Sequence, residues 1–208
     1  MHDYLPLFPL DVVLFPEMLL PLHIFEERYK EMIGECLQGK SVFGVLYAHG
    51  DRVERIGCTA EISQVVRRYP DGRMDLVAVG KKRFQVSFFD SQRAYLQADF
   101  EWLPDTDAEG EPSEERARRT LELFGKVCKL TGQDPEDPSR EFSRQGLAFS
   151  LASRLQLTNE IRQCILEALS EDSRLELLAE HLSELVPILT SRHKLARQAG
   201  SNGHLRHE

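Results

Sequence analysis

The sequence predicts an α+β fold in which a β-rich part, residues 1–103, precedes a helical part, residues 116–199. In the first part, apolar residues alternate with polar ones or stand in short runs broken by prolines, which is typical of antiparallel strands with one buried face. In the second part, apolar residues recur every three or four positions, as on the buried side of a helix. Residues 104–115 are acidic and lack large apolar side chains, so we expect a linker there, followed after the helices by a flexible tail at residues 200–208.

Three short apolar runs open the β-rich part: LPLFPL (residues 5–10), VVLFP (12–16) and MLLPL (18–22). The prolines that separate them suit strand edges and turns rather than helices. Helical spacing of apolar residues over 26–37 then predicts a helix, and VFGVLY (42–47) predicts a strand.

A hairpin signal follows. GCTAEISQVVRRY (residues 57–69) and MDLVAVG (74–80) flank the turn sequence PDGR (70–73), which predicts two antiparallel strands joined by a tight turn. RFQVSFF (83–89) and YLQADFEW (95–102) alternate apolar and polar side chains, so we expect two further half-buried strands.

Three apolar stripes predict the helices of the second part. Their members are Ala117, Leu121, Phe124 and Cys128; then Ile161, Cys164, Ile165, Ala168 and Leu169; then Leu175, Leu178, Ala179, Leu182, Leu185, Val186 and Leu189. Asp137 followed by Pro138 predicts a helix start.

The composition excludes several functional classes. The chain has 208 residues, of which 41% are hydrophobic and 29% charged, as in a globular protein with a substantial core. The formal net charge of −8 argues against a protein whose main role is to bind a polyanion such as nucleic acid. The most apolar segment, residues 5–25, is interrupted by Asp11, Glu17 and four prolines, which excludes a membrane-spanning helix. It follows no basic region, which argues against a secretory signal.

Four cysteines are scattered without a C-x-x-C pair: Cys36, Cys58, Cys128 and Cys164. This pattern predicts free, mostly buried thiols in a reducing cytoplasm.

The stretch GECLQGKS, residues 34–41, fits the phosphate-binding P-loop pattern letter by letter. A working P-loop follows a strand and opens a helix, whose N-terminus faces the phosphates. Here the predicted helix precedes the motif and the predicted strand follows it, which is the reverse order. We therefore interpret the match as a coincidence and Gly39 as the C-terminal cap of the helix.

Other patterns of catalysis are absent from the sequence. It has no G-x-S-x-G elbow and no H-E-x-x-H pair, and His23 stands beside a single carboxylate, Glu26. We expect His23 to be a structural hydrogen-bonding residue, and we predict no catalytic residue, no cofactor and no metal ligand.

Basic residues gather around the hairpin: Arg67, Arg68 and Arg73 flank its turn, and Lys81 to Arg83 follow its second strand. They suit either a basic edge for RNA or solvated charges that protect an exposed strand. Tyr69 is the one aromatic residue interleaved with them, and RNA binding would favour several.

Several long motifs resemble the N-terminal substrate-binding domain of Lon proteases. They are LPLFPLDVVLFPEMLLPLHIFEERY (5–29), IGCTAEI (56–62), DGRMDLVAVGKKRF (71–84), YLQADFEWLPD (95–105) and LAFSLASRLQLTNEIRQCILEALSEDSRLELLAEHL (147–182). The resemblance covers residues 5–190. It implies a PUA-like β pseudo-barrel with one inserted helix, followed by a helical bundle. A related domain in cereblon serves as a protein-interaction scaffold.

The resemblance also implies a function. In Lon proteases this domain helps to recognise unfolded polypeptides and supports ring assembly, whereas the ATPase and the Ser-Lys protease lie in later domains that the motifs do not include; here the chain stops at Glu208. We therefore expect a non-enzymatic polypeptide-binding or adaptor protein in the cytoplasm, whose partners are unfolded or extended segments and a protease or chaperone. We place the binding site at strand ends and around the inserted helix, at Pro21, His23, Phe25, Tyr69 and Arg83. The alternatives are an RNA-binding PUA-like protein and a small-ligand sensor that uses a pocket in the barrel.

Overall fold

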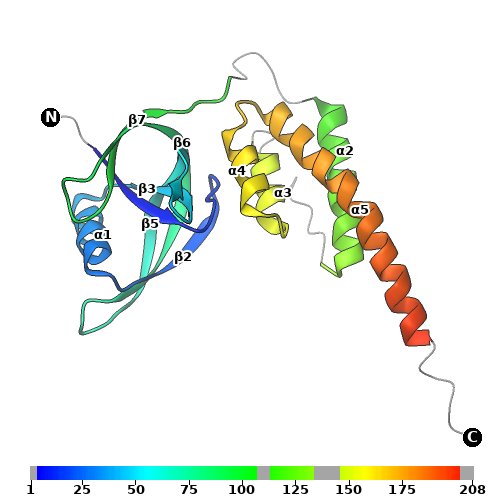
Figure 1. The fold of residues 1–208 in the computed structure, drawn as a ribbon, viewed down its shortest axis with the longest axis horizontal. Coiled ribbons are helices and arrows are strands. Elements are labelled where there is room, and N and C mark those ends of the chain that lie inside the picture. The colour runs from blue at the N-terminus through cyan, green and yellow to red at the C-terminus, as the bar shows by residue number, and fades with distance from the viewer. Residues whose placement is uncertain (1–3, 107–112, 134–145, 202–208) are drawn as a thin grey trace, which may run out of the picture.

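The computed structural model in Figure 1 has a β-rich part and a helical part side by side, which confirms the α+β class. It describes residues 4–106, 113–133 and 146–201. The predicted helix start at Asp137 and Pro138 lies outside these residues.

The elements follow one another in two blocks. The first contains β1 (Leu5–Leu10), β2 (Leu19–Ile24), α1 (Glu27–Gly39), β3 (Phe43–His49), β4 (Arg52–Val53), β5 (Ile56–Arg68), β6 (Met74–Asp90) and β7 (Gln97–Trp102). The second contains α2 (Glu114–Thr131), α3 (Leu147–Arg154), α4 (Asn159–Glu167) and α5 (Glu171–Ser201). In Figure 1, α5 lies beside α2 and extends away from the sheet toward the C-terminus.

The seven strands form one strongly curved sheet in the order β1-β7-β6-β5-β3-β4. Because β1 pairs with β7 on one side and in parallel with β3 on the other, the sheet curls back on itself. It is not a regular barrel, since β2 lies off this path and pairs with the first half of β6. Together β2, β6 and the second half of β5 form a three-stranded extension of the sheet.

The two strands expected at residues 74–80 and 83–89 are one continuous strand, β6, of 17 residues. Gly80 marks the place where the sequence suggested a break. A Cβ atom at Gly80 would lie 2.0 Å from the carbonyl oxygen of Phe15, so glycine lets the loop before β2 dock directly on the strand. The loop backbone bonds there in both directions, from Glu17 N–H to Gly80 C=O and from Gly80 N–H to Met18 C=O. The close approach explains the glycine without a turn.

The predicted order of helix, turn and strand is confirmed, because α1 runs into the P-loop match and ends at Gly39, and β3 follows the match. The predicted cap was one residue off. Lys40, with φ 49° and ψ 41°, takes the left-handed conformation that we expected for Gly39, and its N–H bonds to the carbonyl of Cys36. The helix continues through Gly39, so the chain reverses only at Lys40.

One hydrophobic cluster runs from the sheet into the helices, and a second, smaller one lies inside the curved sheet. The rings of Phe15, from the loop before β2, and Phe149, from α3, lie 5.2 Å apart where the two parts meet. The predicted stripe of α5 is buried at Leu175, Leu178 and Leu182. The helical part is thus packed against the sheet.

The stripe predicted for α4 is only partly correct. Ile165 is buried, but Cys164 and Leu169 are exposed, whereas Gln163 and Leu166 face inward. The helix ends at Glu167, before the last two residues of the stripe, and polar contacts select its buried face. Gln163 Nε2 donates to the carbonyl of Ile56 on β5 at 3.0 Å.

Candidate functional site

Residues along β2 point alternately to the core and to the outer face of the sheet, as expected for a half-buried strand. Leu20 and Ile24 are buried, whereas Leu19, Pro21 and His23 are exposed. Their partners on β6 are Val79, Val77 and Asp75, which stand directly opposite and therefore on the same face. We call these six residues the β2 outer face.

A polar and aromatic cluster closes one end of this face. His23 Nδ1 lies 2.6 Å from Asp75 Oδ1, and the hydroxyl of Tyr69 donates to Asp75 Oδ2 at 2.8 Å. The ring of Phe25 stacks on His23 at 5.9 Å, and the ring of Tyr69 meets it edge-on at 6.1 Å. We call His23, Phe25, Tyr69 and Asp75 the His23 cluster.

The hydrogen bonds of this cluster shift two pKa values in opposite directions. The bonds from His23 and then Tyr69 lower the pKa of Asp75, because they stabilise its ionised form. The bond to Asp75 raises the pKa of Tyr69, and partial desolvation adds to the shift. The guanidinium groups of Arg67 and Arg73 lie 4.7 and 5.0 Å from the centre of the Tyr69 ring. The cluster is thus ordered by its own contacts, yet Phe25 remains 59% exposed.

Four of the five residues predicted for the site lie together: Pro21, His23, Phe25 and Tyr69. His23 makes a structural hydrogen bond, as expected, but its partner is Asp75. Glu26, its neighbour in the sequence, pairs with Arg28 instead. Asp75 was missed from the sequence. The strand register that places it opposite His23 joins residues 52 positions apart.

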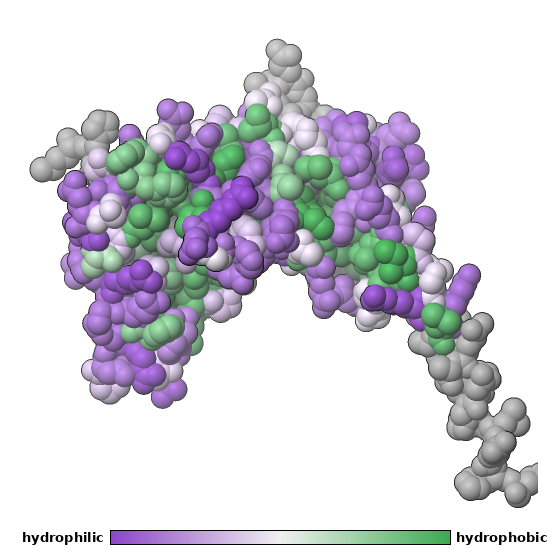
Figure 2. Space-filling view, in the orientation of Figure 1, coloured by the Kyte–Doolittle hydropathy of each residue, from purple (hydrophilic) through white to green (hydrophobic). Residues whose placement is uncertain are grey.

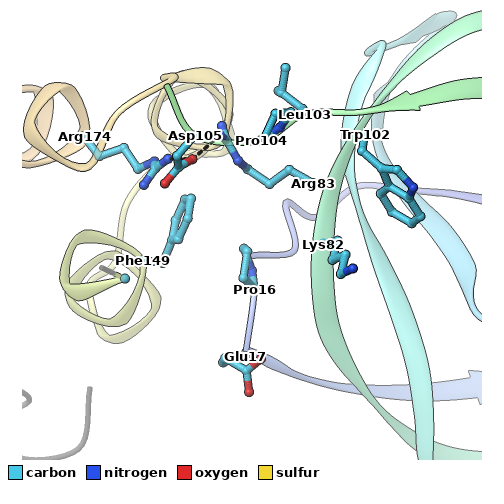
Figure 3. A pocket seen from close by; sticks show the side chains of 11 residues that line it. Pro16, Glu17, Lys82, Arg83, Trp102, Leu103, Pro104, Asp105, Phe149 and Arg174 are labelled. Atoms are coloured by element: carbon cyan, nitrogen blue, oxygen red, sulfur yellow. Dashed lines mark hydrogen bonds and ion pairs between the residues drawn. The ribbon is translucent and has the colours of Figure 1, made fainter. Parts of the chain in front are cut away.

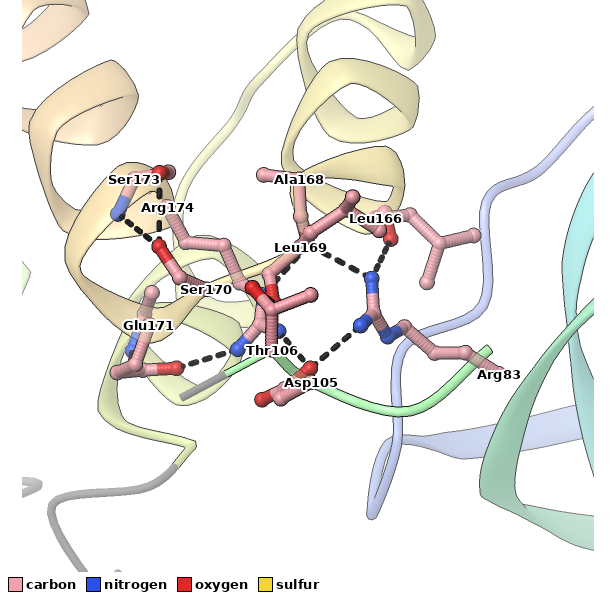
Figure 4. A network of polar contacts seen from close by, with 11 residues as sticks. Arg83, Asp105, Thr106, Leu166, Ala168, Leu169, Ser170, Glu171, Ser173 and Arg174 are labelled. Carbon is pink, nitrogen blue, oxygen red and sulfur yellow. Dashed lines mark hydrogen bonds and ion pairs between the residues drawn. The ribbon is translucent and has the colours of Figure 1, made fainter. Parts of the chain in front are cut away.

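Arg83, the fifth predicted residue, lies elsewhere and is only 5% exposed. Its guanidinium donates at 2.7 Å to the carbonyls of Leu166 and Ala168, at the end of α4, and pairs with Asp105 (Figure 4). A cation at the carbonyl end of a helix is a favourable placement. Arg83 therefore joins the sheet to the helices.

Arg174, from the first turn of α5, completes this network in Figure 4. It pairs with the same oxygen of Asp105 and, at 2.7 Å, with the carboxylate of Glu171. Glu171 in turn accepts the N–H of Ala148 near the start of α3, at 2.7 Å. We call Arg83, Asp105, Glu171 and Arg174 the Arg83 latch.

Burial dominates the electrostatics of the latch. Desolvation lowers the pKa of Arg83, and the neighbouring charge of Arg174 acts in the same direction. Desolvation raises the pKa of Glu171, although the bond from Ala148 and the charge of Arg174 oppose it. Two cations and two carboxylates bind one another there, so the latch serves to hold the parts together.

A cleft of about 630 Å³ opens beside the latch, between the sheet and α3 (Figure 3). Trp102 from β7 lies on its rim, half exposed, with Lys82 Nζ 5.4 Å from the ring centre. The inside of the curved sheet, by contrast, is filled by buried side chains such as Leu7, Leu46 and Phe84.

The described residues contain no group of three or more His, Cys, Asp or Glu side chains placed to hold a metal ion. None of the helices in these ranges is long and apolar enough to cross a membrane.

Residues 4–184 match the family model of the substrate-binding domain of ATP-dependent protease La (LON). The chain belongs to this family. Among curated relatives, the Lon protease of Endomicrobium trichonymphae is 27% identical over 87% of this chain, and that of Dictyoglomus thermophilum is 26% identical over 94%. The chain spans about a quarter of the length of these relatives, 24% and 26% respectively. Only the substrate-binding domain of the Lon family is matched.

Solved structures support the same fold. A Lon N-terminal domain protein from Xanthomonas campestris superposes with a TM-score of 0.67 at 26% identity, covering 85% of this chain and 96% of that one. The N-terminal domain of Lon protease from the Mycobacterium avium complex gives a TM-score of 0.65 over 87% of this chain and 98% of that one, and at 20% identity shows the fold alone. The resemblance to Lon N-terminal domains is thus confirmed.

Proposed function

We propose that this Lon-type domain binds unfolded or extended polypeptide segments on the β2 outer face and the adjoining His23 cluster, without catalysing a reaction itself. Membership of the family supports a Lon-like role in substrate recognition. The observation that carries the choice of surface is the exposure of Leu19 on the β2 outer face and of Phe25 in the adjoining His23 cluster, 62% and 59%. Large apolar side chains gathered on an exposed surface are typical of protein-interaction sites.

The chemistry of this surface suits apolar polypeptide. Leu19, Pro21, Val77 and Val79 present aliphatic groups, and Phe25 adds an exposed ring. Figure 2 shows one face of the molecule, on which apolar surface forms separate patches among hydrophilic side chains. Apolar surface on that face is therefore confined to limited areas. His23 and Tyr69 combine aromatic rings with polar tips, which is typical of residues that dominate binding interfaces.

RNA binding is the second candidate, and the basic residues near the hairpin argue against it. Lys81 lies 3.3 Å from Glu61, and Arg73 lies 2.7 Å from Asp71. Arg83 is buried in the latch. These contacts reduce the positive charge available to phosphates, in a chain whose net charge is −8.

The proposal includes a cytoplasmic location and a role as an adaptor that passes bound segments to a protease or chaperone. The four cysteines support the location, since all are free thiols and a reducing compartment preserves such thiols. Mild crosslinking in native cells followed by co-purification tests the adaptor role. We expect enriched protease or chaperone subunits, and enrichment of RNA instead would contradict the role.

The test of the binding site uses a reduced and carboxymethylated protein as a permanently unfolded probe, with affinity measured by fluorescence anisotropy. We expect Phe25→Ser to weaken binding about tenfold, as for loss of an aromatic anchor. The matched control is Phe88→Ser on β6, where the ring is 63% exposed but lies outside the β2 outer face. Equal effects of the two variants would contradict the assignment of the surface, and absence of binding by the wild type would contradict the function.

A further inference from the structure

The open edge of β2 has a defined hydrogen-bonding pattern. The bond from Gly80 N–H to Met18 C=O sets the alternation of the antiparallel pair, so the residues at 20, 22 and 24 exchange backbone bonds with β6. The backbone groups of Leu19, Pro21 and His23 therefore point away from β6. Within the described residues no strand pairs with this side of β2. The free edge offers the N–H groups of Leu19 and His23 and three carbonyl oxygens.

The opposite edge of the three-stranded extension, residues 61–68 of β5, is protected in ways that β2 is not. Two register shifts, at 62/64 and 65/67, interrupt its ladder, and Glu61, Arg67 and Arg68 place charges along it. Bulges and charges are the usual devices that prevent pairing at a sheet edge. In contrast, β2 pairs in unbroken register over six residues that include no acidic side chain, lysine or arginine. The β5 edge is thus protected along its length, whereas the β2 edge carries one proline, Pro21, as such a device.

We propose that an extended segment of a client polypeptide adds to the free edge of β2 as a further strand. This inference rests on the proposed function and names the binding mode of the same site. The edge is six residues long, which at about 3.3 Å per residue accommodates a segment of about 20 Å. Backbone hydrogen bonds then supply affinity for any extended chain, and side chains that face Leu19 and Phe25 supply a preference for apolar residues.

Pro21 distinguishes a client from a second copy of this chain. If two β2 edges paired about their centres, Pro21 would face Pro21, and neither residue has an N–H to donate. A client segment places its own N–H opposite the Pro21 carbonyl and recovers one of the two bonds lost in the symmetric pair. The central proline thus favours a foreign strand over self-association.

N-methylated peptides test the backbone pattern directly. The probe is the fluorescent peptide acetyl-Thr-Val-Thr-Val-Thr-Val-Thr-amide, with two versions that carry N-methyl groups on either the valines or the threonines. In an added strand only alternate N–H groups face β2. We expect one version to bind at least about tenfold more weakly to the full chain and the other to bind within about twofold of the parent peptide.

A substitution in the protein gives an independent measurement. Pro21→Ala adds an N–H at the centre of the free edge, so we expect about three- to tenfold tighter binding of the unmethylated peptide. The control is Pro104→Ala, an exposed proline in the cleft, which should leave the affinity unchanged. Weaker binding by Pro21→Ala would contradict strand addition, because it would mean that the ring itself is the contact.

The outcomes separate this inference from the proposed function. If both methylated peptides bind like the parent while Phe25→Ser still impairs binding of unfolded protein, strand addition is wrong and the proposed function stands. If neither peptide nor unfolded protein binds, both are wrong. If light scattering shows a wild-type dimer that dissociates as peptide is added, the occupant of the edge is a second copy and the inference is overturned.

Discussion

The His23 cluster and the Arg83 latch combine the same kinds of side chain in two different environments. Each joins a basic residue to an aspartate beside an aromatic ring: His23 with Asp75 and Phe25, and Arg83 with Asp105 near Phe149. In the first, the side chains of His23 and Asp75 are 46% and 34% exposed. In the second, both arginines are at least 95% buried.

This difference in burial indicates different roles for the two clusters. Every guanidinium group of the latch is engaged by a carboxylate or a helix-end carbonyl, so the latch retains little capacity for a new ligand. The His23 cluster is ordered by Asp75 but leaves the ring of Phe25 at the surface. We infer that the Arg83 latch fixes the helices on the sheet and that the His23 cluster offers a preformed surface. The predictions below probe this contrast.

The largest expected effect is on the latch. Arg83→Met keeps an unbranched apolar stem but removes the donor to Leu166, Ala168 and Asp105. Breaking a buried ion pair in this way should lower the free energy of unfolding by about 3–5 kcal/mol. Urea unfolding followed by circular dichroism measures the change. The control Arg73→Met removes an exposed arginine near the His23 cluster, and an equal loss in both variants would contradict the contrast.

A smaller effect is expected for the coupling between partners. A double-mutant cycle on Arg83 and Asp105 should give a coupling free energy of about 1–2 kcal/mol, a moderate value because Asp105 is 38% exposed. The same cycle on His23 and Asp75 should give a much smaller coupling, since water screens an exposed pair. Comparable couplings in the two cycles would show that burial does not distinguish the clusters.

The smallest effects concern pH, and their signs differ between the two regions. The pKa of Asp75 is lower in the folded protein than in the unfolded chain, so its contribution to stability is present above about pH 4 and is lost as the pH falls through the native pKa. The pKa of Glu171 is raised by burial, so its contribution is present below about pH 4 and is lost as the pH rises through the native pKa.

Two variants, Asp75→Asn and Glu171→Gln, test the signs of these pH dependences. As the pH is lowered from 7 to 3, the stability difference between wild type and Asp75→Asn should shrink, whereas wild type should gain relative to Glu171→Gln. Urea midpoints at several pH values test both trends. The same sign in the two variants would mean that burial does not control Glu171.

Local patterns allowed much of the fold to be predicted. The alternation of residues 57–80 around PDGR predicted the β5–β6 hairpin, because strand period and turn chemistry are both local. The continuity of β6 could not be predicted, since Gly80 looks like a break until the docking of Phe15 explains it. The buried face of α4 could not be predicted either. Gln163 turns inward because it bonds to β5, and Cys164 is exposed as a result.

Only those residues of the candidate site that are close together along the chain could be predicted from the sequence. Pro21 and His23 lie in β2 and Phe25 follows it, and the resemblance to Lon N-terminal domains pointed to that region. Asp75 depends on strand register, which joins distant residues, and so escaped notice. Arg83 shows the limit of charge patterns, because a basic run does not reveal which of its members is buried.

Hydrogen–deuterium exchange with and without a saturating unfolded polypeptide tests the central claim most directly. We predict that the amides of Leu19 and His23 on the free edge of β2 become protected on binding, while residues 102–106 at the cleft and the latch do not change. Protection confined to residues 102–106 and 146–149, with none in β2, would contradict the account and assign recognition to the cleft beside the latch.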